Sequence, residues 1–381
     1  MKIAAPLSHD CERLLNIVGG LSLCFDESLI LAWDIKPLFS FFKAITGADL
    51  NLGRIWDLKI IEKFYGIEGY APKTVEKALS RLAKLPLEGF SSLYNQVYYP
   101  LITTVIPQME ATGVAHRGKK KILHPFFEIE EHANGRLKCR KAFYRSYLPH
   151  NLSSEDKENL APVDYDDVFV YFDFKSYEVA VLQWLSGDIK LGKALSSGNA
   201  YEYIWSAVTS LQPDTQSEKR GKLLFLPMIF GLGPRTLAKD FKIDEKTARE
   251  LINRFNHSFP TAFTWIESQG VDDDNYATDH FGRRRKIEQG NEYLVRNFSV
   301  QAPASIISLK KLVKLHEKTK DFSKLCFHLH DGFCILVNKG EIRRAANIGT
   351  EVLEAPDNLF PDLKLKVSCV WGRRLDQLKT I

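Results

Sequence analysis

Asp173 and Asp331 each follow a strongly apolar stretch, where a carboxylate needs a partner. Asp173 closes VFVYFD (168–173), and Asp331 lies in LCFHLHDGFCILV (325–337), a pattern that predicts two strands meeting at a tight turn. A metal ion, a basic partner or exposure at the strand end would each satisfy such a carboxylate. If the strands are neighbours in one sheet, the carboxylates meet, and paired hard oxygen ligands suit Mg²⁺. Either aspartate alone is more commonly a turn or cap residue.

A second candidate is the segment SEKRGKLLFLPMIFGLG (217–233), which predicts a helix. Lys222, Leu226 and Phe230 fall at four-residue steps on one helix face, and Lys219 lies close to that face. Cations at one end of a face and flat apolar groups at the other could hold a triphosphate and a base. The alternative is an amphipathic core helix whose lysines extend into solvent.

The elements that must position these residues follow from the hydrophobic pattern. The chain has 381 residues, of which 45% are hydrophobic and 12% aromatic, as in a globular protein. The pattern predicts, in order, an α+β unit over 1–90, a helix over 98–114, a β-rich region over 124–148, a loop over 151–167, helices from 176 to 267, a turn between short strands at 280–287, a long helix over 291–318, and a helix followed by a last strand over 363–371.

Charge and cysteine usage restrict the function classes. The net charge is only +5, but HRGKKK (116–121), RLKCRK (136–141) and GRRRK (282–286) concentrate it and favour a phosphate-bearing partner. The six cysteines show no CxxC spacing, which is typical of reduced thiols and not of a zinc site. No apolar run approaches the roughly 20 residues of a membrane span, and charge comes too early for a secretory signal. We therefore expect an intracellular, cytoplasmic protein.

Three segments together resemble a known family. DFKSYEVAVLQWLSGD (173–188), SEKRGKLLFLPMIFGLGPRTLAKDF (217–241) and HLHDGFCILV (328–337) resemble, in order, the first palm motif, the fingers helix and the second palm motif of family A DNA polymerases, the bacterial polymerase I group. The resemblance covers roughly 95–381. It implies an α/β (α+β) fold: a right-hand palm with an antiparallel sheet, helical fingers, and an N-terminal α+β remnant of an exonuclease domain.

The resemblance also implies a domain division and an activity. The expected regions are a degenerate 3′–5′ exonuclease-like domain over 1–94, a first palm part over 95–190, fingers over 191–290 and a second palm part over 291–381. The implied activity is DNA-directed DNA polymerisation by two-metal nucleotidyl transfer on primer-template DNA with dNTPs. Asp173 and Asp331 would be catalytic and would hold two Mg²⁺ ions, or Mn²⁺ in their place, together with the carbonyl of Phe174.

The remaining site residues follow from the same resemblance. The implied nucleotide-binding residues are Glu178, Lys219, Arg220, Lys222, Leu226 and Phe230. Glu178 matches the position that blocks a ribose 2′-hydroxyl. The implied DNA-binding residues are Arg136, Arg283, Arg284, Asn297, Gln301 and His330.

The chain departs from the family pattern at several positions. Glu218 stands where the family has Arg, Leu226 replaces an aromatic residue, Phe230 replaces Tyr, Gly332 replaces a Glu, and Pro227 is expected to kink the helix. We expect poorer nucleotide affinity or altered selectivity, and a slower enzyme.

Two whole regions also depart from the family. Only residues 115–123 stand where the family inserts a helical thumb, which predicts low processivity and salt-dependent activity. The thumb is either absent or its function is supplied by a replication partner. In the exonuclease-like region Leu38 occupies a position that needs Asp, and Asp34 and Asp57 are too few for a metal pair, which predicts no proofreading. The resemblance implies that such an enzyme suits gap filling or lesion bypass in a bacterial or phage-infected cell. The alternatives are an RNA- or primer-synthesising relative and an inactive polymerase-like module that binds DNA or serves as a replication scaffold.

Overall fold

The structure, a computed structural model, describes residues 23–25, 29–32, 34–46, 54–67, 80–81, 84–129, 134–139, 149, 152–229 and 233–381. The chain forms two compact units. We call the first the sheet unit (Met1–Asp173, Ile306–Ala355 and Val367–Ile381) and the second the helical unit (Phe174–Ser305 and Pro356–Lys366). Helix α15 (Tyr293–Thr319) contributes residues to both.

The sheet unit is organised around a five-stranded sheet in the order β12-β13-β9-β14-β15. Its strands are β9 (Asp167–Phe174), β12 (Ser323–Leu329), β13 (Gly332–Asn338), β14 (Val367–Gly372) and β15 (Lys379–Thr380). Residues 332–337 of β13 are all buried, which is typical of a strand covered on both faces. Antiparallel pairing of β13 with β9 confirms the prediction that the strands bearing the two aspartates are neighbours.

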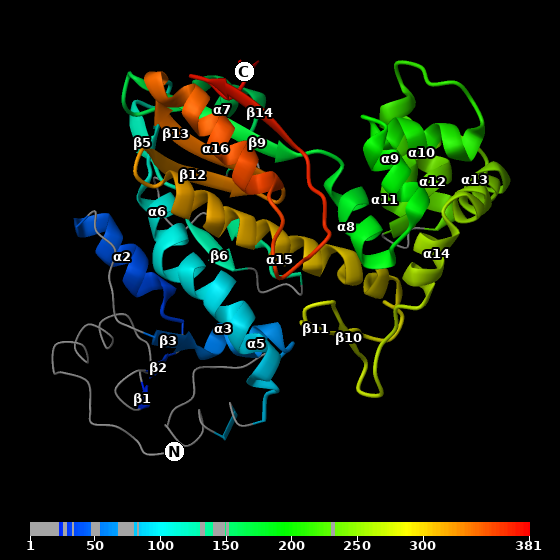
Figure 1. The fold of residues 1–381 in the computed structure, drawn as a ribbon, viewed down its shortest axis with the longest axis horizontal. Helices are drawn as coiled ribbons and strands as arrows, with labels where there is room; N and C mark the ends of the chain where they lie inside the picture. Colours follow the sequence, from blue (N-terminus) through cyan, green and yellow to red (C-terminus); the bar gives the residue numbers. More distant parts are fainter. Residues whose placement is uncertain are drawn as a thin grey trace. The chain divides into compact units, whose positions relative to one another are not determined.

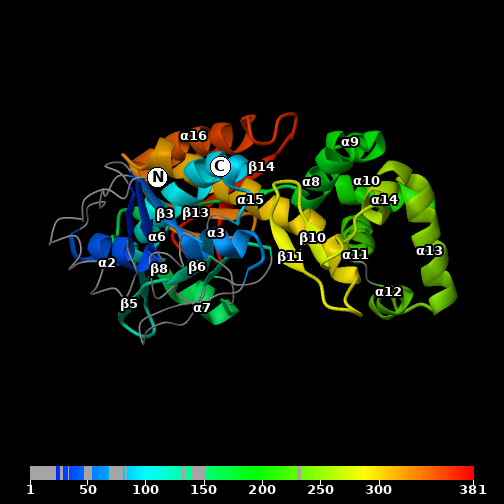
Figure 2. The same cartoon turned by 90° about the horizontal axis from the view of Figure 1, so that it is seen from below.

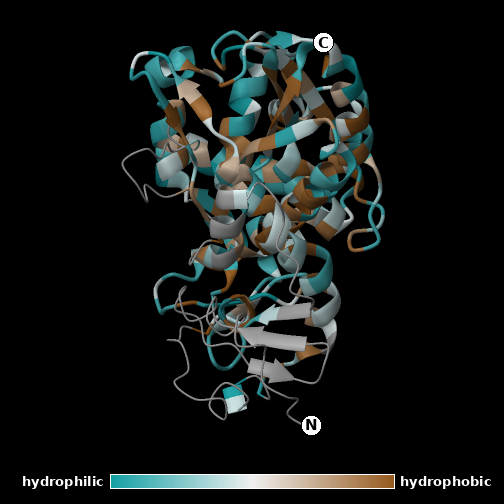
Figure 3. Ribbon diagram, turned by 90° about the vertical axis from the view of Figure 1, so that its left-hand side faces the viewer, coloured by the Kyte–Doolittle hydropathy of each residue, from teal (hydrophilic) through white to brown (hydrophobic). Residues whose placement is uncertain are grey.

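Helix α16 (Ile342–Glu354) covers one face of this sheet (Figure 1). A Cβ on Gly349 would lie 2.2 Å from Cζ of Phe172, so the absence of a side chain lets the helix approach that ring closely. Lys311 of α15 is 0% exposed and donates hydrogen bonds to the carbonyls of Val352 and Ala355, at the end of α16. Hydrophobic residues, brown in Figure 3, supply the core between these helices and the strands.

The N-terminal part of the sheet unit has its own small sheet. Strands β1 (Leu23–Phe25), β2 (Leu29–Ala32) and β3 (Arg54–Asp57) pair in that order, and helices α2 (Lys36–Thr46) and α3 (Leu58–Phe64) follow β2 and β3. A helical run then extends through α5 (Leu87–Leu93), two π-helical turns (Tyr94–Tyr98 and Leu101–Val105) and α6 (Ile106–Ala111). The helix predicted over 98–114 therefore begins earlier and ends at Ala111.

A β-hairpin lies where the sequence leaves little room for a thumb. Strands β4 (Val114–His116) and β5 (Lys121–Leu123) form it, β8 (Leu160–Pro162) pairs with β4, and β6 (Phe127–Ile129) pairs with β7 (Leu137–Cys139). No α-helix lies among the described residues 112–129 and 134–139.

The prediction of a loop over 151–167 was wrong. Helix α7 (Ser154–Asn159) forms there because Ser153 and Asp156 make a reciprocal capping box, and β8 follows it directly. The three residues of β8 form a strand only because they pair with β4, and no local sequence pattern predicts that pairing.

The helical unit consists of short helices, as predicted for 176–267 (Figure 2). Its helices are α8 (Tyr177–Ser186), α9 (Ile189–Ser196), α10 (Ala200–Thr209), α11 (Ser217–Ile229), α12 (Pro234–Phe241), α13 (Glu245–Ser258) and α14 (Pro260–Glu267). Strands β10 (Tyr276–Thr278) and β11 (Arg284–Lys286) form the predicted hairpin. Among the described helices of the whole chain, none is long and apolar enough to span a bilayer.

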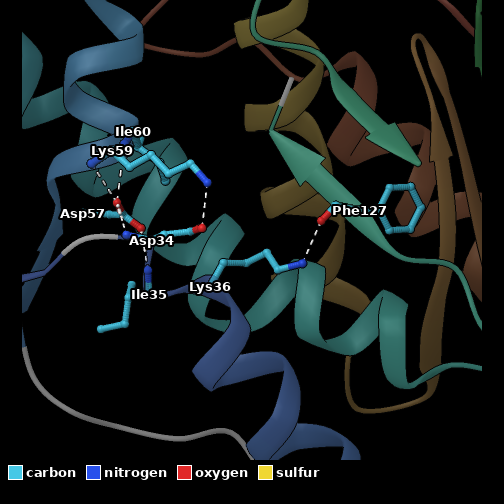
Figure 4. A network of polar contacts seen from close by, with 7 residues as sticks. All are labelled: Asp34, Ile35, Lys36, Asp57, Lys59, Ile60 and Phe127. Carbon is cyan, nitrogen blue, oxygen red and sulfur yellow. Dashed lines mark hydrogen bonds and ion pairs between the residues drawn. The ribbon is translucent and has the colours of Figure 1, made fainter. Parts of the chain in front are cut away.

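Asp57 anchors the small N-terminal sheet (Figure 4). Its side chain is 1% exposed and accepts backbone N–H bonds from Asp34 at 3.0 Å, Ile35 at 2.8 Å and Lys59 at 3.0 Å. Burial raises the pKa of Asp57 to about 6, and the N–H donors oppose that rise. The carboxylate therefore caps α3 and holds the chain after β2, which is a structural role.

We expect Asp57→Ala to lower the free energy of unfolding by about 3 kcal/mol, because it removes a helix cap and leaves several buried N–H groups without an acceptor. Urea unfolding measures this. Lys59→Gln is the matched control: it breaks only the ion pair between Lys59 and Asp34, whose side chains are 29% and 42% exposed. Such surface pairs contribute at most about 1 kcal/mol. Equal losses from both substitutions would contradict the anchoring role.

Candidate active site

The two predicted metal ligands lie at the same edge of the five-stranded sheet. Gly332 pairs directly with Asp173 across β13 and β9, and Asp331 immediately precedes Gly332 in the chain. Asp331 belongs to the turn that joins β12 to β13, so both acidic residues lie at the end of the sheet where that turn is found. No group of three or more potential metal-binding His, Cys, Asp or Glu side chains occurs in the described part of the chain. The candidate centre is thus a carboxylate pair, the number that Mg²⁺ commonly takes from a protein.

A strained two-residue turn presents Asp331. Leu329 pairs with Gly332, so His330 and Asp331 alone connect β12 to β13, and His330 has φ of 54°. Non-glycine residues adopt such angles uncommonly. Ser308 of α15 donates a 2.6 Å hydrogen bond to the His330 carbonyl and lies 2.8 Å from Nε2 of His328. The helix thereby holds the turn in place.

Tyr171 is a residue of this site that sequence reasoning missed. Its hydroxyl donates to Oδ1 of Asp173 at 3.3 Å. Burial, followed by the negative charges of Asp173 and Asp331, raises the pKa of Tyr171 well above its usual value. The negative charges of both carboxylates therefore lie near one phenol, and a cluster of oxygen ligands of this kind fits a divalent cation. The signal was the two-residue spacing from Tyr171 to Asp173, which places both on one strand face.

Phe174, whose carbonyl was predicted to complete a metal site, lies at the end of β9. Its ring stacks on Tyr177 with centroids 4.9 Å apart, and its side chain is 3% exposed. The side chain is therefore a packing element, and the role of the carbonyl stays a prediction.

Two candidate nucleotide-binding residues, Lys222 and Glu178, lie near Tyr201 in the helical unit. Nζ of Lys222 lies 5.9 Å from the ring centroid of Tyr201, and the Tyr201 hydroxyl lies 3.5 Å from Oε2 of Glu178. Tyr201 of α10 therefore links the predicted phosphate ligand to the predicted sugar-contacting residue. No spacing in the sequence pointed to Tyr201, because its position between them depends on how α10 and α11 pack.

Arg220, one of the predicted nucleotide-binding residues, does not share the helix face of Lys222. Its guanidinium forms a 2.9 Å ion pair with Asp214 and lies 5.6 Å from the ring of Trp205. Residues two apart on a helix point in nearly opposite directions. Lys219, which is exposed and three residues before Lys222, is the better second cation.

Glu218, Leu226 and Pro227 are further departures from the family pattern on α11. Leu226 is half-buried, and Pro227 lies inside the helix, which continues to Ile229. Glu218 accepts a 2.9 Å hydrogen bond from Asn199, the cap residue of α10. Phe230 lies outside the described residues, as does the side chain of Leu38.

Gly221 lets α11 approach α10 at Tyr201. A Cβ there would lie 1.9 Å from the backbone oxygen of Tyr201, and a carbonyl cannot rotate away as a side-chain end could. We expect Gly221→Ala to lower the free energy of unfolding by about 2 kcal/mol and to weaken nucleotide binding. Gly192→Ala in α9 is the control, since its Cβ would meet only Gln183 at 3.8 Å and should leave stability unchanged or slightly raised. Thermal unfolding and dNTP titration measure both.

Arg283, which was predicted to contact DNA, is buried, and its contact with DNA stays a prediction. Its side chain is 3% exposed, and its positive charge lies near the buried carboxyl of Asp279. Burial raises the pKa of Asp279 to about 7, and the charge of Arg283 opposes that rise. Arg284 is half-exposed, pairs with Asp272, and lies 4.3 Å from the ring of Tyr276. The buried pair therefore shapes the β10–β11 turn, and Arg284 is the better candidate for a DNA contact.

The other predicted DNA-binding residues remain accessible in their units. Asn297 and Gln301 are half-buried and lie four residues apart on one face of α15. His330 is exposed in the turn beside Asp331, and Arg136 is half-buried just before β7. Their contacts with DNA stay predictions.

Comparison with known proteins identifies the family. The family model described as DNA polymerase family A matches residues 61–377. The thermostable DNA polymerase I of Thermus filiformis is 27% identical over 219 residues, covering 53% of this chain and 26% of that protein. The DNA polymerase of Mycobacterium phage D29 is 23% identical over 155 residues, covering 39% of this chain and 26% of that protein. The matched stretch is thus about a quarter of the length of each relative.

A solved structure shows the same fold. The POL domain of Pol1 from M. smegmatis, in complex with DNA primer-template and dNTP, superposes with a TM-score of 0.58 at 18% identity, covering 90% of this chain and 65% of that one. The polymerase-domain fold and the family match agree, and they confirm the resemblance drawn from the three sequence motifs. The chain belongs to DNA polymerase family A.

Proposed function

We propose that the protein is a DNA-directed DNA polymerase that adds dNMP units to a primer 3′-end. The observation that carries this proposal is the pairing of Gly332 with Asp173, which puts both acidic residues of the family motifs at one sheet edge. A chain that only bound DNA would gain nothing from two anionic groups facing DNA phosphates.

In this proposal Asp173 and Asp331 hold Mg²⁺, for which Mn²⁺ can substitute. When bound, the metal would lower the pKa of the primer 3′-hydroxyl and neutralise charge on the triphosphate and the departing pyrophosphate. The sheet contributes rigidity: paired strands and the turn held by Ser308 keep the two carboxylates at fixed positions. This arrangement needs little reorganisation when substrate binds.

The helical unit binds the incoming nucleotide. Lys222 and Lys219 are exposed cations on adjacent turns of α11 and attract the triphosphate. Glu178 excludes a ribose 2′-hydroxyl, and the nearby Tyr201 hydroxyl orients its carboxylate. The substrate is therefore a deoxynucleotide.

Asn297, Gln301, Arg284, Arg136 and His330 contact primer and template. Gln301 contacts minor-groove acceptors, which are alike for every correct pair and so report pairing without reading sequence. The buried Arg283 acts on Asp279 within the β10–β11 hairpin, next to Arg284.

The β4–β5 hairpin takes the place of the family thumb, and it provides only a weak grip on the duplex. Its turn exposes Arg117, Lys119 and Lys120, which can contact phosphates. The resulting enzyme has low processivity and no proofreading, and it suits gap filling or lesion bypass, with a replication partner able to supply the missing grip.

Salt dependence tests the hairpin. We expect Lys119→Gln combined with Lys120→Gln to reduce the slope of log affinity for primer-template against log salt by about 2, because each phosphate contact contributes roughly one released counterion. Lys318→Gln with Lys320→Gln, which changes two exposed lysines at the end of α15, should leave the slope unchanged. Long products from single binding events, in the presence of a DNA trap, would contradict the weak grip.

Primer extension with Mg²⁺ tests the proposed activity, using dNTPs and rNTPs in parallel. We expect extension with dNTPs and at most weak extension with rNTPs. Preferred incorporation of rNTPs would instead identify an RNA-synthesising relative. Tight binding of primer-template with no extension by either substrate would identify an inactive DNA-binding module.

A further inference from the structure

The hydroxyl of Tyr171 occupies the space that a side chain at position 332 would need. A Cβ built on Gly332 would lie 2.0 Å from Oη of Tyr171 and 2.6 Å from its Cζ. Gly332 has no positive φ, so its backbone does not require glycine. The neighbouring tyrosine requires it. Residue 332 is the position where the sequence departs from the family pattern by lacking a carboxylate.

The same hydroxyl reaches a proposed metal ligand. Tyr171 and Asp173 are two residues apart on β9 and extend from one face, and Oη donates to Oδ1 of Asp173 at 3.3 Å. The tyrosine ring is held from the side by Phe327 of β12, with ring centroids 6.5 Å apart. Because the Tyr171 ring packs against Phe327, its hydroxyl restricts the rotation of the Asp173 carboxylate to which it is hydrogen-bonded.

We propose that Tyr171 is a positioning residue for the Asp173 carboxylate, and that glycine at position 332 is the complement that makes room for it. The inference rests on the proposed function, because it assigns Asp173 to metal binding. The Tyr171 hydroxyl thus helps to orient the Asp173 carboxylate, a role that a side chain at position 332 could otherwise take. Outer partners that orient a metal-ligating carboxylate typically change metal affinity 10- to 100-fold when removed.

Tyr171→Phe is the direct test, because it removes only the hydroxyl and keeps the ring in its packing site. Mn²⁺ titration followed by electron paramagnetic resonance measures metal binding without turnover. We expect about 10-fold weaker Mn²⁺ binding. The Mg²⁺ concentration for half-maximal primer extension should rise by a similar factor, with the unfolding midpoint unchanged. Tyr165→Phe, at an exposed tyrosine before β9, is the control and should change neither quantity.

Gly332→Ala, on β13, tests whether glycine at position 332 is needed to leave room for the Tyr171 hydroxyl. The new methyl must push the hydroxyl away from Asp173, so this variant should also weaken Mn²⁺ binding about 10-fold although it removes no polar group. In Tyr171→Ala/Gly332→Glu the hydroxyl is gone and a carboxylate takes its place. We expect this double variant to bind Mn²⁺ more tightly than Gly332→Glu alone, in which glutamate and tyrosine compete for one space.

The outcomes separate the inference from the proposed function. A wild-type protein that extends no primer contradicts the polymerase proposal. A wild-type protein that extends primers, together with a Tyr171→Phe variant whose Mn²⁺ affinity and Mg²⁺ dependence are unchanged, overturns the positioning role alone. Loss of stability in Tyr171→Phe without any shift in metal binding would likewise reduce Tyr171 to a packing residue and overturn the inference.

Discussion

Alanine at either Asp173 or Asp331 is expected to lower the primer-extension rate at least about 1000-fold, which corresponds to about 4 kcal/mol of activation free energy. Each substitution removes half of the carboxylate pair that would hold Mg²⁺. The loss of rate should far exceed any loss of stability: Asp173→Ala removes the acceptor of the Tyr171 hydroxyl, which costs about 1 kcal/mol, and each carboxylate is half-buried. Single-turnover extension and urea unfolding, measured on the same preparations, separate the two effects.

Asp166→Asn is the matched control for this pair. Asp166 precedes β9 at the end of the strand away from Asp173, is exposed, and lies 3.5 Å from Lys339 in a surface ion pair. Its replacement should leave extension unchanged. Product formed at an undiminished rate by Asp173→Ala or Asp331→Ala would contradict the metal assignment, and with it the proposed mechanism.

Lys222→Ala has the second-largest expected effect, a fall of about 100-fold in kcat/KM for dNTP. The exposed lysine faces the triphosphate in the proposed complex, and a compact cation is strongly favoured beside phosphate oxygens. Because Lys222 is on the surface of α11, its removal should change the free energy of unfolding by less than about 0.5 kcal/mol. Steady-state kinetics with a single-nucleotide gap measure the effect, and Lys222→Arg should retain part of the activity.

Two controls on neighbouring cations sharpen this prediction. Lys190→Ala changes an exposed lysine of α9 and should have no effect on kcat/KM. Arg220→Ala should change it less than about threefold, because that guanidinium is engaged by Asp214 on another face of α11. If Arg220→Ala were the more damaging of the two α11 substitutions, the assignment of the phosphate-binding face would be wrong.

Local sequence patterns were sufficient to predict many of the helices and strands. Continuous apolar runs predicted β9, β12 and β13, the tight turn at Asp331 followed from the His-Asp-Gly sequence where β12 meets β13, and the long helix α15 followed from its periodicity. The segment over 151–167 failed, since β8 exists only by pairing with β4. Propensity and periodicity are local properties, and a three-residue strand has too few residues to display either.

The order of three motifs along the chain was sufficient to indicate the family, the acidic pair and the lysine-bearing helix, because each motif preserves residue types at short spacing. The tertiary structure alone decided that Tyr171 fills the space beside Gly332, that Tyr201 stands between Lys222 and Glu178, and that Arg283 is buried. These relations join residues distant in sequence, or depend on which way a side chain turns as elements pack. The free energy that selects them comes from burial and steric fit across elements, which spacing along one chain does not encode.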